Sequence, residues 1–584
     1  MIDTTLHEAA DAGDEKSLVA LLRHGDREAV NAFDDAGFTP LMYAAKSAAA
    51  SAEVVGLLIE RGAHVRAFAT DGSFDSNRSV VSLALADGDP AKIKRLIEAG
   101  SDISYSRNGF GAMLDAVHGR DILHDERLIP LLRLLIAHGA RLDDVSSHAE
   151  SALRVLSRIG RFDALAVLLE AGADETQLEW TPLIKAAALG TVSDVQAAAG
   201  DLQYLEAIDW WERTAWLVAV LSGDVEKAKL LRDLGTNIEA RGRCDQPALF
   251  YAIEAHREAM LRWSLDIGTP IDTTDKFGTA ALNVAATAGN AAAIKMLLDA
   301  GANLDRSHDI DQSALSDAAT PAVAKLLMDA GADPRRLPFE ARRSLLGLPA
   351  EPSERLLKVS ELEFRRGWRR RVGARNPESM EDPFWLGMIR SGVNAYAAAR
   401  RFGKPEALER EPVWCAQRFG QSITFLPDGR IVQIGGEHED FYDPDFCIYN
   451  DVFVHELDGS IRIYGYPEDV FPPTDFHTAT LIGGAIYIIG SLGYQGARPF
   501  GKTPVHKLDT QSFRIDRVDA TGDAPGWIYQ HRAVLTGTRE IRITGGLIAQ
   551  HENDKETHIK NDDAFVLDVR RNVWMKDKSH AVAQ

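Results

Sequence analysis

The stretch TPLMYAA at residues 39–45 decides the fold of the N-terminal half of the chain. It returns as TPLIKAA at 181–187, a looser copy, TLHEAADAGD, stands at 5–14, and its second half returns as LNVAATAGN at 282–290. The threonine caps a helix, the proline takes the first turn, where no N–H is needed, and the alanines allow close packing. The stretch therefore predicts a short helix that packs against further copies of itself.

A second apolar stretch follows each copy and ends at a glycine. In the clearest example Val54, Leu57 and Leu58 follow helical spacing, and the glycine ends such a helix in the left-handed conformation. The gaps between these glycines are 37, 38, 39, 33, 63, 33, 33 and 30 residues, and the long gap holds a degenerate Gly200-Asp201. About ten units of roughly 33 residues result. The glycines are Gly25, Gly62, Gly100, Gly139, Gly172, Gly235, Gly268, Gly301 and Gly331.

Motif and period together resemble the ankyrin repeat over residues 4–345. The resemblance implies an α-solenoid that binds another macromolecule through a concave surface of hairpin turns and inner helices. Large aromatic residues in those turns are candidate interface anchors. The alternative for the tryptophan pair is that one ring packs inward onto the neighbouring repeat. The partner-binding candidates are Asp34, Asp35, Trp210, Trp211, Arg213, Asp275, Lys276 and Phe277.

From residue 414 onward the pattern changes to alternating apolar and polar residues with glycine turns. Gly435, Gly490 and Gly545 are 55 residues apart, and each ends a predicted hairpin that a second hairpin follows. Four strands per unit, with the order His477-small residue, glycine pair and distant Trp574, resemble kelch repeats over 414–578. Only three such units are present, whereas about four to eight blades close a propeller. The resemblance therefore implies an incomplete β-propeller of three antiparallel blades.

Three blades leave edge strands that something must cover. One helix predicted at 383–402 could cap them, or two copies of the chain could join into a six-bladed ring, which would make the protein a homodimer. A basic run, RRGWRRR, precedes that helix at 365–371, and we expect it to make intramolecular contacts or to face solvent. The predicted fold is thus multidomain α plus β, with an ankyrin solenoid at 1–345, a helical basic joint at 346–412 and kelch-like blades at 413–584.

Charge and composition exclude several classes of protein. The 584 residues carry 65 Lys and Arg against 86 Asp and Glu, a net charge of −21, and residues 1–350 hold 52 acidic and 35 basic residues, or −17. An acidic array repels phosphate backbones, so we expect no nucleic-acid binding and a partner with a basic surface. Three scattered cysteines, and the lack of a signal sequence or a long apolar run, favour a soluble cytoplasmic protein without membrane contact.

Polar loops after the glycine pairs hold the other candidate site residues, His438, Asp440, Tyr442 and His551. Imidazoles near carboxylates can bind a cation or transfer protons, but this spacing matches no metal or catalytic motif. We therefore expect no enzyme activity, metal or cofactor, and keep an enzyme or metal-binding protein that uses these loops as the alternative.

The leading interpretation is an interaction scaffold that binds a protein partner through the ankyrin surface. Alanine-rich helices without long disordered linkers suggest a bacterial source, in which ankyrin proteins include immunity or antitoxin-type partners of toxins. An adaptor role and a host-directed effector are the alternatives, and the sequence does not distinguish them.

Overall fold

The computed structural model describes residues 5–22, 27–70, 77–118, 120–200, 202–304, 313–332, 337, 339–403, 412–438, 446–552 and 555–577. The chain forms two compact units, Met1–Phe277 (unit 1) and Gly278–Gln584 (unit 2). Each is described separately below. Within the described ranges, every helix is too short or too polar to cross a lipid bilayer.

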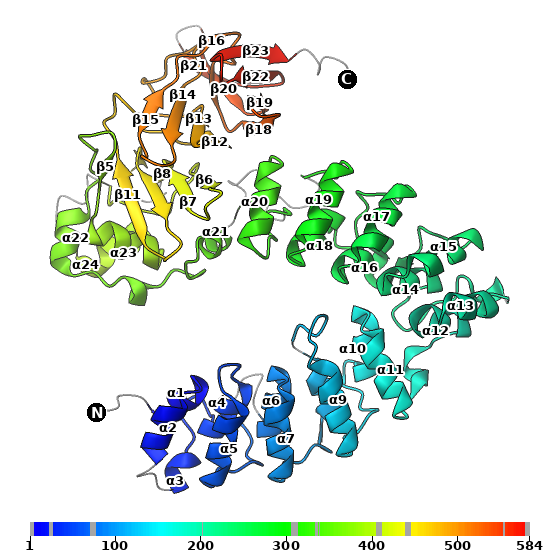
Figure 1. The fold of residues 1–584 in the computed structure, drawn as a ribbon. Helices are drawn as coiled ribbons and strands as arrows, with labels where there is room; N and C mark the ends of the chain where they lie inside the picture. The colour runs from blue at the N-terminus through cyan, green and yellow to red at the C-terminus, as the bar shows by residue number, and fades with distance from the viewer. Residues whose placement is uncertain are drawn as a thin grey trace. The chain divides into compact units, whose positions relative to one another are not determined.

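Unit 1 is a row of antiparallel helix pairs (Figure 1). The inner helices lie side by side, α1 against α4, α4 against α6, α12 against α14 and α14 against α16, and their side chains are the most buried in the unit. The pairs are α1 (Leu6–Asp11) and α2 (Glu15–Leu22), α4 (Pro40–Lys46) and α5 (Ala52–Glu60), α6 (Val80–Asp87) and α7 (Pro90–Glu98), α8 (Ala112–Val117) and α9 (Leu128–Ala137), α10 (Ala152–Ile159) and α11 (Phe162–Glu170), α12 (Pro182–Leu189) and α13 (Val192–Ala198), α14 (Ala215–Ser222) and α15 (Val225–Asp233), and α16 (Ala248–Glu254) and α17 (Glu258–Asp266).

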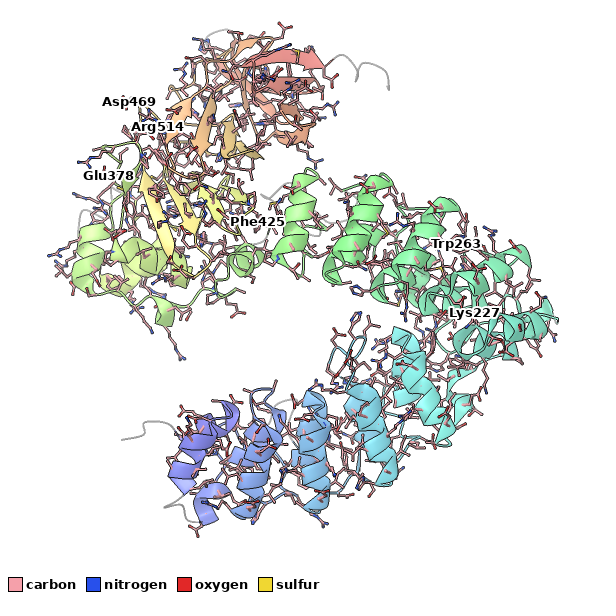
Figure 2. All side chains as sticks on the ribbon, viewed as in Figure 1. Lys227, Trp263, Glu378, Phe425, Asp469 and Arg514 are labelled. Atoms are coloured by element: carbon pink, nitrogen blue, oxygen red, sulfur yellow. The ribbon has the colours of Figure 1, made fainter. Side chains whose placement is uncertain are left out.

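The motif residues act as their chemistry predicts. The hydroxyl of Thr39 accepts a hydrogen bond from the N–H of Met42 at the start of α4, and Thr181 caps α12 in the same way. At the hairpin turn before an inner helix, an aspartate closes the loop: Asp34 accepts hydrogen bonds from the N–H groups of Ala36 and Phe38. Side chains between helices add further ties, such as the ammonium of Lys227 on α15, which donates to the carbonyl oxygen of Ala187 at 3.1 Å (Figure 2). Local capping thus fixes where these inner helices begin.

The row departs from regular stacking at α10. The hairpin at 209–213 lies directly against α10, since the guanidinium of Arg213 donates to both the carbonyl oxygen (2.8 Å) and the hydroxyl (2.5 Å) of Ser157. The indole N–H of Trp211 also donates to the carbonyl oxygen of Arg154 at 2.9 Å. These contacts join segments 56 and 57 residues apart, which is more than one repeat. A concave pocket forms at this irregular step.

Unit 2 begins with two further repeat-type elements, α18 (Ala281–Thr287) with α19 (Ala291–Asp299), and α20 (Pro321–Asp329). After α21 (Phe339–Leu345), the joint folds into α22 (Glu361–Gly367), α23 (Pro383–Ser391) and α24 (Ala395–Phe402). The prediction of one helix at 383–402 was wrong, because Gly392, at φ 68°, ends α23 in the left-handed conformation and Asn394 caps a new helix. The basic run forms intramolecular ion pairs, among them Arg370 with Glu468 and Arg371 with Asp382.

The rest of unit 2 is a stack of antiparallel sheets, as the alternation predicted (Figure 1). The three main sheets have the orders β5-β11-β10-β7-β6, β12-β13-β14-β15 and β16-β23-β22-β19-β18, in which only the β16 and β23 pair is parallel. Their strands are β5 (Glu378–Ser379), β6 (Ser422–Phe425), β7 (Ile431–Ile434), β10 (Val452–His455), β11 (Ile461–Gly465), β12 (Thr478–Ile482), β13 (Ala485–Ile489), β14 (Val505–Asp509), β15 (Ile515–Arg517), β16 (Thr521–Gly522), β18 (Arg532–Thr536), β19 (Glu540–Thr544), β22 (Ala564–Asp568) and β23 (Val573–Asp577).

Smaller sheets complete the stack. One is the pair β8 (Glu437–His438) and β9 (Cys447–Ile448), and the other is the set β17 (Trp527–Tyr529), β20 (Leu547–Glu552) and β21 (Lys555–Lys560).

The 55-residue spacing of the glycines has a structural reason at two of its three positions. A Cβ on Gly435 would lie 2.2 Å from the carbonyl oxygen of Thr474, and one on Gly490 would lie 2.4 Å from that of Ile528. Each glycine therefore admits the chain of the next sheet. Gly545 follows β19 of the third main sheet. A Cβ there would lie within 4 Å of none of the described residues, so the stack ends at this sheet.

Helices of the joint cover the first sheet. Trp385 on α23 stacks on Trp414 with ring centroids 4.6 Å apart, and Trp414 packs on Phe453 of β10 in one apolar core. The same face would have to be free if sheets from two copies were to close a six-bladed ring. The described residues form three stacked sheets capped by helices, and they form no closed propeller or barrel.

Candidate partner-binding site

The strongest grouping of predicted residues lies at the irregular step of unit 1. Trp210 and Trp211 are both half-buried and meet edge to face, with centroids 4.6 Å apart at 89°. Trp211 contacts α10 of another repeat through its indole N–H, in line with the alternative weighed for this pair, yet both rings stay partly exposed. Three arginines surround them, so that Arg154, Arg158, Trp210, Trp211 and Arg243 form what we call the tryptophan–arginine cluster.

Each arginine of this cluster lies over an indole ring. The guanidinium carbons of Arg154 and Arg243 are 4.1 and 4.2 Å from the ring centroid of Trp210. Those of Arg243 and Arg158 are 4.9 and 5.5 Å from the centroid of Trp211. Such contacts contribute about 0.5–2 kcal/mol each, depending on how far the pair is removed from water. They hold the two rings in fixed positions at the edge of the row, which is what an interface anchor requires.

Arg213, predicted to bind a partner, lies inside the protein instead. Only 1% of its side chain is exposed, and its guanidinium donates two hydrogen bonds to Asp209, at 3.0 and 2.5 Å. Asp209 also accepts from the N–H groups of Trp211 and Arg213, so the aspartate closes the turn and neutralises the arginine at once. We therefore correct this prediction: Arg213 positions the tryptophan turn and does not reach the surface.

The other predicted turn residues lie at the surface. Phe277 is 68% exposed, and the carboxylate of Asp275 accepts a hydrogen bond from its N–H at 2.9 Å. The ammonium of Lys276 lies 5.0 Å from the phenyl centroid of Phe277. At the first turn, Asp35 is exposed, while Asp34 is half-buried and accepts from the hydroxyl of Tyr43 at 2.8 Å. Burial, together with this carboxylate, raises the pKa of Tyr43 to about 12.

Beside the tryptophan–arginine cluster is a concave pocket of 520 Å³, which we call the bend pocket. Its volume falls in the range of about 300–1,000 Å³ that is typical of ligand sites. Apolar side chains of Leu123, Ile159 and Leu221 form part of its wall, next to Trp211. The polar lining consists of Asp121, Arg158, Arg213, Arg243, Cys244, Gln246, Tyr251, Glu254 and Asp275.

The charged groups of the pocket stand on a concave wall. Protein atoms therefore surround them, although water still reaches them. Desolvation raises the pKa of Glu254 above its ordinary value, against the opposing effects of a hydrogen bond from Gln246 and the charge of Arg158. Burial also raises the pKa of Tyr251 well above that of a free phenol, which keeps its hydroxyl neutral. Desolvation lowers the pKa of Arg154.

Sequence reasoning identified the two tryptophans but missed most of their surroundings. Arg154 and Arg158 stand on α10, and Arg243 stands one repeat after the tryptophans. Tyr251 and Glu254 belong to α16, whose motif match is weak. The available signal was helical spacing, since Arg154 and Arg158 are four residues apart on one face of a short helix. The contact between α10 and the 209–213 hairpin, which skips a repeat, has no local sequence signal.

The two sheet-loop candidates that the structure describes, His438 and His551, lie in different sheets. His438 is buried in β8, where it pairs with Cys447 of β9, and His551 lies on β20 with its ring 5.8 Å from that of Phe500. Asp440 and Tyr442 lie outside the described residues. The part of the chain that the structure describes holds no group of three or more His, Cys, Asp or Glu side chains that could bind a metal ion.

Comparison with protein families supports the repeat interpretation. A family model described as ankyrin repeats (3 copies) matches residues 2–69 and 249–337. The chain therefore contains ankyrin repeats in both regions, and the tryptophan–arginine cluster lies in the helical repeats between them. The sheet region is β-rich and antiparallel, and its likeness to kelch repeats remains a resemblance in sequence. A search of curated proteins finds no match.

Proposed function

We propose that the protein binds a protein partner through the hairpin turns of unit 1, with Trp210, Trp211 and Phe277 as anchors. The observation that carries this proposal is the tryptophan–arginine cluster, in which two half-exposed indoles are fixed by three guanidiniums beside a 520 Å³ pocket. Trp and Arg are enriched among the residues that contribute most to protein interfaces. Ankyrin repeats at both ends of the helical region support the same role.

Exposure of Phe277 adds to the support. Burying a phenyl ring stabilises by about 1.5–3 kcal/mol, and this ring is left in water although the turn that carries it is well formed. A single exposed apolar residue is ordinary, but this one belongs to the same unit as the half-exposed tryptophans.

Site-specific photo-crosslinking in cells tests the proposal. A benzoylphenylalanine at position 277 should give one or a few discrete adducts, whereas the same probe at Leu457 should give none. Leu457 is a fair control because it is 78% exposed and lies in a sheet loop of unit 2. Adducts from position 277 should also weaken when Trp210→Ala is introduced. Equal labelling from both positions, or none from position 277 under any growth condition, would count against the proposal.

The finer roles follow from the same premise. We propose an immunity or antitoxin-type partner of a basic toxin as the first possibility to test, because unit 1 lies within the most acidic part of the chain. An adaptor or a host-directed effector would use the same surface, and the identity of the crosslinked protein decides among the three. A homodimer through the sheet region would have to use a surface other than the helix-covered face of the first sheet.

A further inference from the structure

A loop of unit 1, residues 120–127, joins repeats that are not neighbours in the row, and we call it the clip loop. It lies between α8 and α9 and is fixed at its base. There the guanidinium of Arg161, in the turn between α10 and α11, donates to the carbonyl oxygens of Ile122 and Leu123. Arg161 also pairs with Asp163 at 2.9 Å, which neutralises the buried cation that holds the loop. The base of the clip loop is thus attached to the following repeat.

The tip of the clip loop reaches a more distant repeat. The imidazole rings of His124 in the loop and of His256, in the turn between α16 and α17, meet edge to face with centroids 5.0 Å apart and planes at 80°. Within the described ranges, neither ring makes a hydrogen bond or an ion pair. The contact between the two rings therefore joins the tip to the α16–α17 turn.

The clip loop and α16 supply two walls of the bend pocket. Asp121 and Leu123 line it from the loop, and Glu254 lines it from α16. His124 directly follows Leu123 in sequence, and His256 stands two residues after Glu254. The contact between the histidines therefore ties these two walls together, and its loss would free the loop wall at its tip.

The environment of the histidine pair favours neutral rings. Desolvation lowers the pKa of His256, and the positive charges of His124 and Arg257 lower it further. The carboxylates of Asp121 and Glu258 oppose this effect, yet the pKa stays below its ordinary value. The contact therefore disfavours the imidazolium form in spite of two nearby carboxylates.

Further charged groups face His124 across a second pocket, of 510 Å³. Besides His124 and Arg257, its charged lining consists of Asp125, Glu126, Arg161, Asp163, Asp224 and Lys227. Most of these charges are already paired, Arg161 with Asp163 and Lys227 with Asp224 at 3.7 Å. Carboxylates, arginines and lysines of this kind keep their charge between about pH 8 and 5.5, whereas histidines change theirs. Protonation of the histidine pair is thus the change of charge that acid causes at this place.

We propose that the clip loop is a pH-dependent latch of unit 1, closed by the contact between neutral His124 and His256 and released when both rings are protonated. Two cations 5.0 Å apart repel each other, so the tip leaves the α16–α17 turn and the bend pocket widens, while Arg161 keeps the base attached. The closed contact binds protons less readily than the released loop does, so lowering the pH favours release.

The competing result is a loop that acid tightens. Asp121 and Glu258 would then accept hydrogen bonds from the protonated rings and hold the tip in place. Desolvation and the charge of His124 outweigh these carboxylates in the closed contact, so we expect release.

Hydrogen-exchange mass spectrometry of the free full chain tests the latch at pH 7.5 and 5.5, with exchange times scaled to the intrinsic rate at each pH. The amides of Leu123 and Arg127 report on the loop because they donate to the carboxylates of Asp121 and Asp125. Protection of peptides that cover 120–127 should fall at least about threefold from pH 7.5 to 5.5. Peptides from α12, in the same unit, should keep their protection.

Variants assign the response to the two rings. His124→Phe keeps an aromatic contact without a charge and should hold the loop protected at both pH values. His256→Asn removes one ring, and asparagine tolerates the φ of 52° at this position, so the loop should be less protected at pH 7.5 and show no further loss at pH 5.5. The matched control is His64→Asn, at an exposed position of unit 1 outside both pockets, which should respond as the unchanged chain does.

Four results would overturn the inference: equal protection of the clip loop at both pH values, a tighter loop at pH 5.5, an equal loss in α12, or an unchanged pH response in His124→Phe. The His124→Phe variant keeps the test open even if His256→Asn folds poorly, because it predicts a gain of protection at pH 5.5. The latch does not rest on the proposed partner surface, since it is measured on the free chain. Crosslinking at Phe277 can therefore succeed or fail without changing this outcome.

Discussion

Replacement of Asp209 should lower the free energy of unfolding of unit 1 strongly, because this carboxylate is buried and pairs with a buried arginine. Its carboxylate accepts four hydrogen bonds, two from the guanidinium of Arg213 and two from backbone N–H groups of the tryptophan turn. Both side chains of the pair are 1% exposed. Asp209→Ala leaves a buried arginine whose remaining contacts, to the backbone and hydroxyl of Ser157, carry no negative charge.

The magnitude follows from these contacts. Removing one partner of a buried ion pair costs about 3–5 kcal/mol, and two N–H groups also lose their acceptor. Removing both charged groups should cost less than the sum of the single losses, because no uncompensated charge remains. We expect Asp209→Ala to lower the free energy of unfolding of unit 1 by about 4 kcal/mol, and the double variant Asp209→Ala/Arg213→Met to show a coupling of about 2 kcal/mol.

Urea denaturation of the full chain, followed by hydrogen-exchange mass spectrometry of peptides from α10 and α14, measures this for unit 1 alone. Asp233→Ala is the matched control, because Asp233 pairs with Arg232 at 2.9 Å but is 65% exposed, and its loss should cost less than about 1 kcal/mol. A cost for Asp209→Ala no larger than that of the control, or strictly additive losses in the double variant, would refute the reasoning.

Two further predictions concern unit 2. Trp385→Ala should cost about 3–5 kcal/mol in urea denaturation, because the ring is fully buried against Trp414 and its N–H donates to the carbonyl oxygen of Gly367. Tyr396→Ala should cost little, because this side chain of α24 is 51% exposed, and equal losses from the two variants would contradict the capping role of α23. Burial lowers the pKa of His455 and of His506 to about 4. Between pH 6.5 and 4 the unfolded state therefore binds more protons than the folded state. The free energy of unfolding should fall as the pH falls through that window, by up to about 3 kcal/mol for each histidine. His455→Gln should flatten the decline measured by denaturation at pH 7, 5.5 and 4.5, and an unchanged slope would assign it to other groups.

Repeating local chemistry made much of the fold predictable. Caps such as Thr39 and Thr181, and glycines that end the outer helices, mark each repeat within a few residues. The glycines at 435 and 490 likewise marked the sheets, because each admits the chain of the next sheet at a distance that only hydrogen permits. Gly392 was missed as a break between α23 and α24, because apolar residues on both sides continue the helical spacing.

The candidate site was predictable only in part, for a related reason. Aromatic residues at a turn stand out in any sequence, so Trp210, Trp211 and Phe277 could be named. Arg213 could not be separated from them, because it follows the half-buried Trp211 and the exposed Glu212 in the same turn. Its burial comes from Asp209 and from Ser157, 56 residues earlier.

By itself, the sequence determined the periodic parts of this protein: the helix pairs, the three sheets and the residues that cap and end them. These depend on contacts within one repeat or between adjacent repeats, which short motifs encode. Only the tertiary structure decided where the repeats deviate, which charged groups become buried and which side chains meet at the bend pocket. Such contacts join segments more than one repeat apart, and their free energy depends on desolvation and on distance in space, which are not local properties of a sequence.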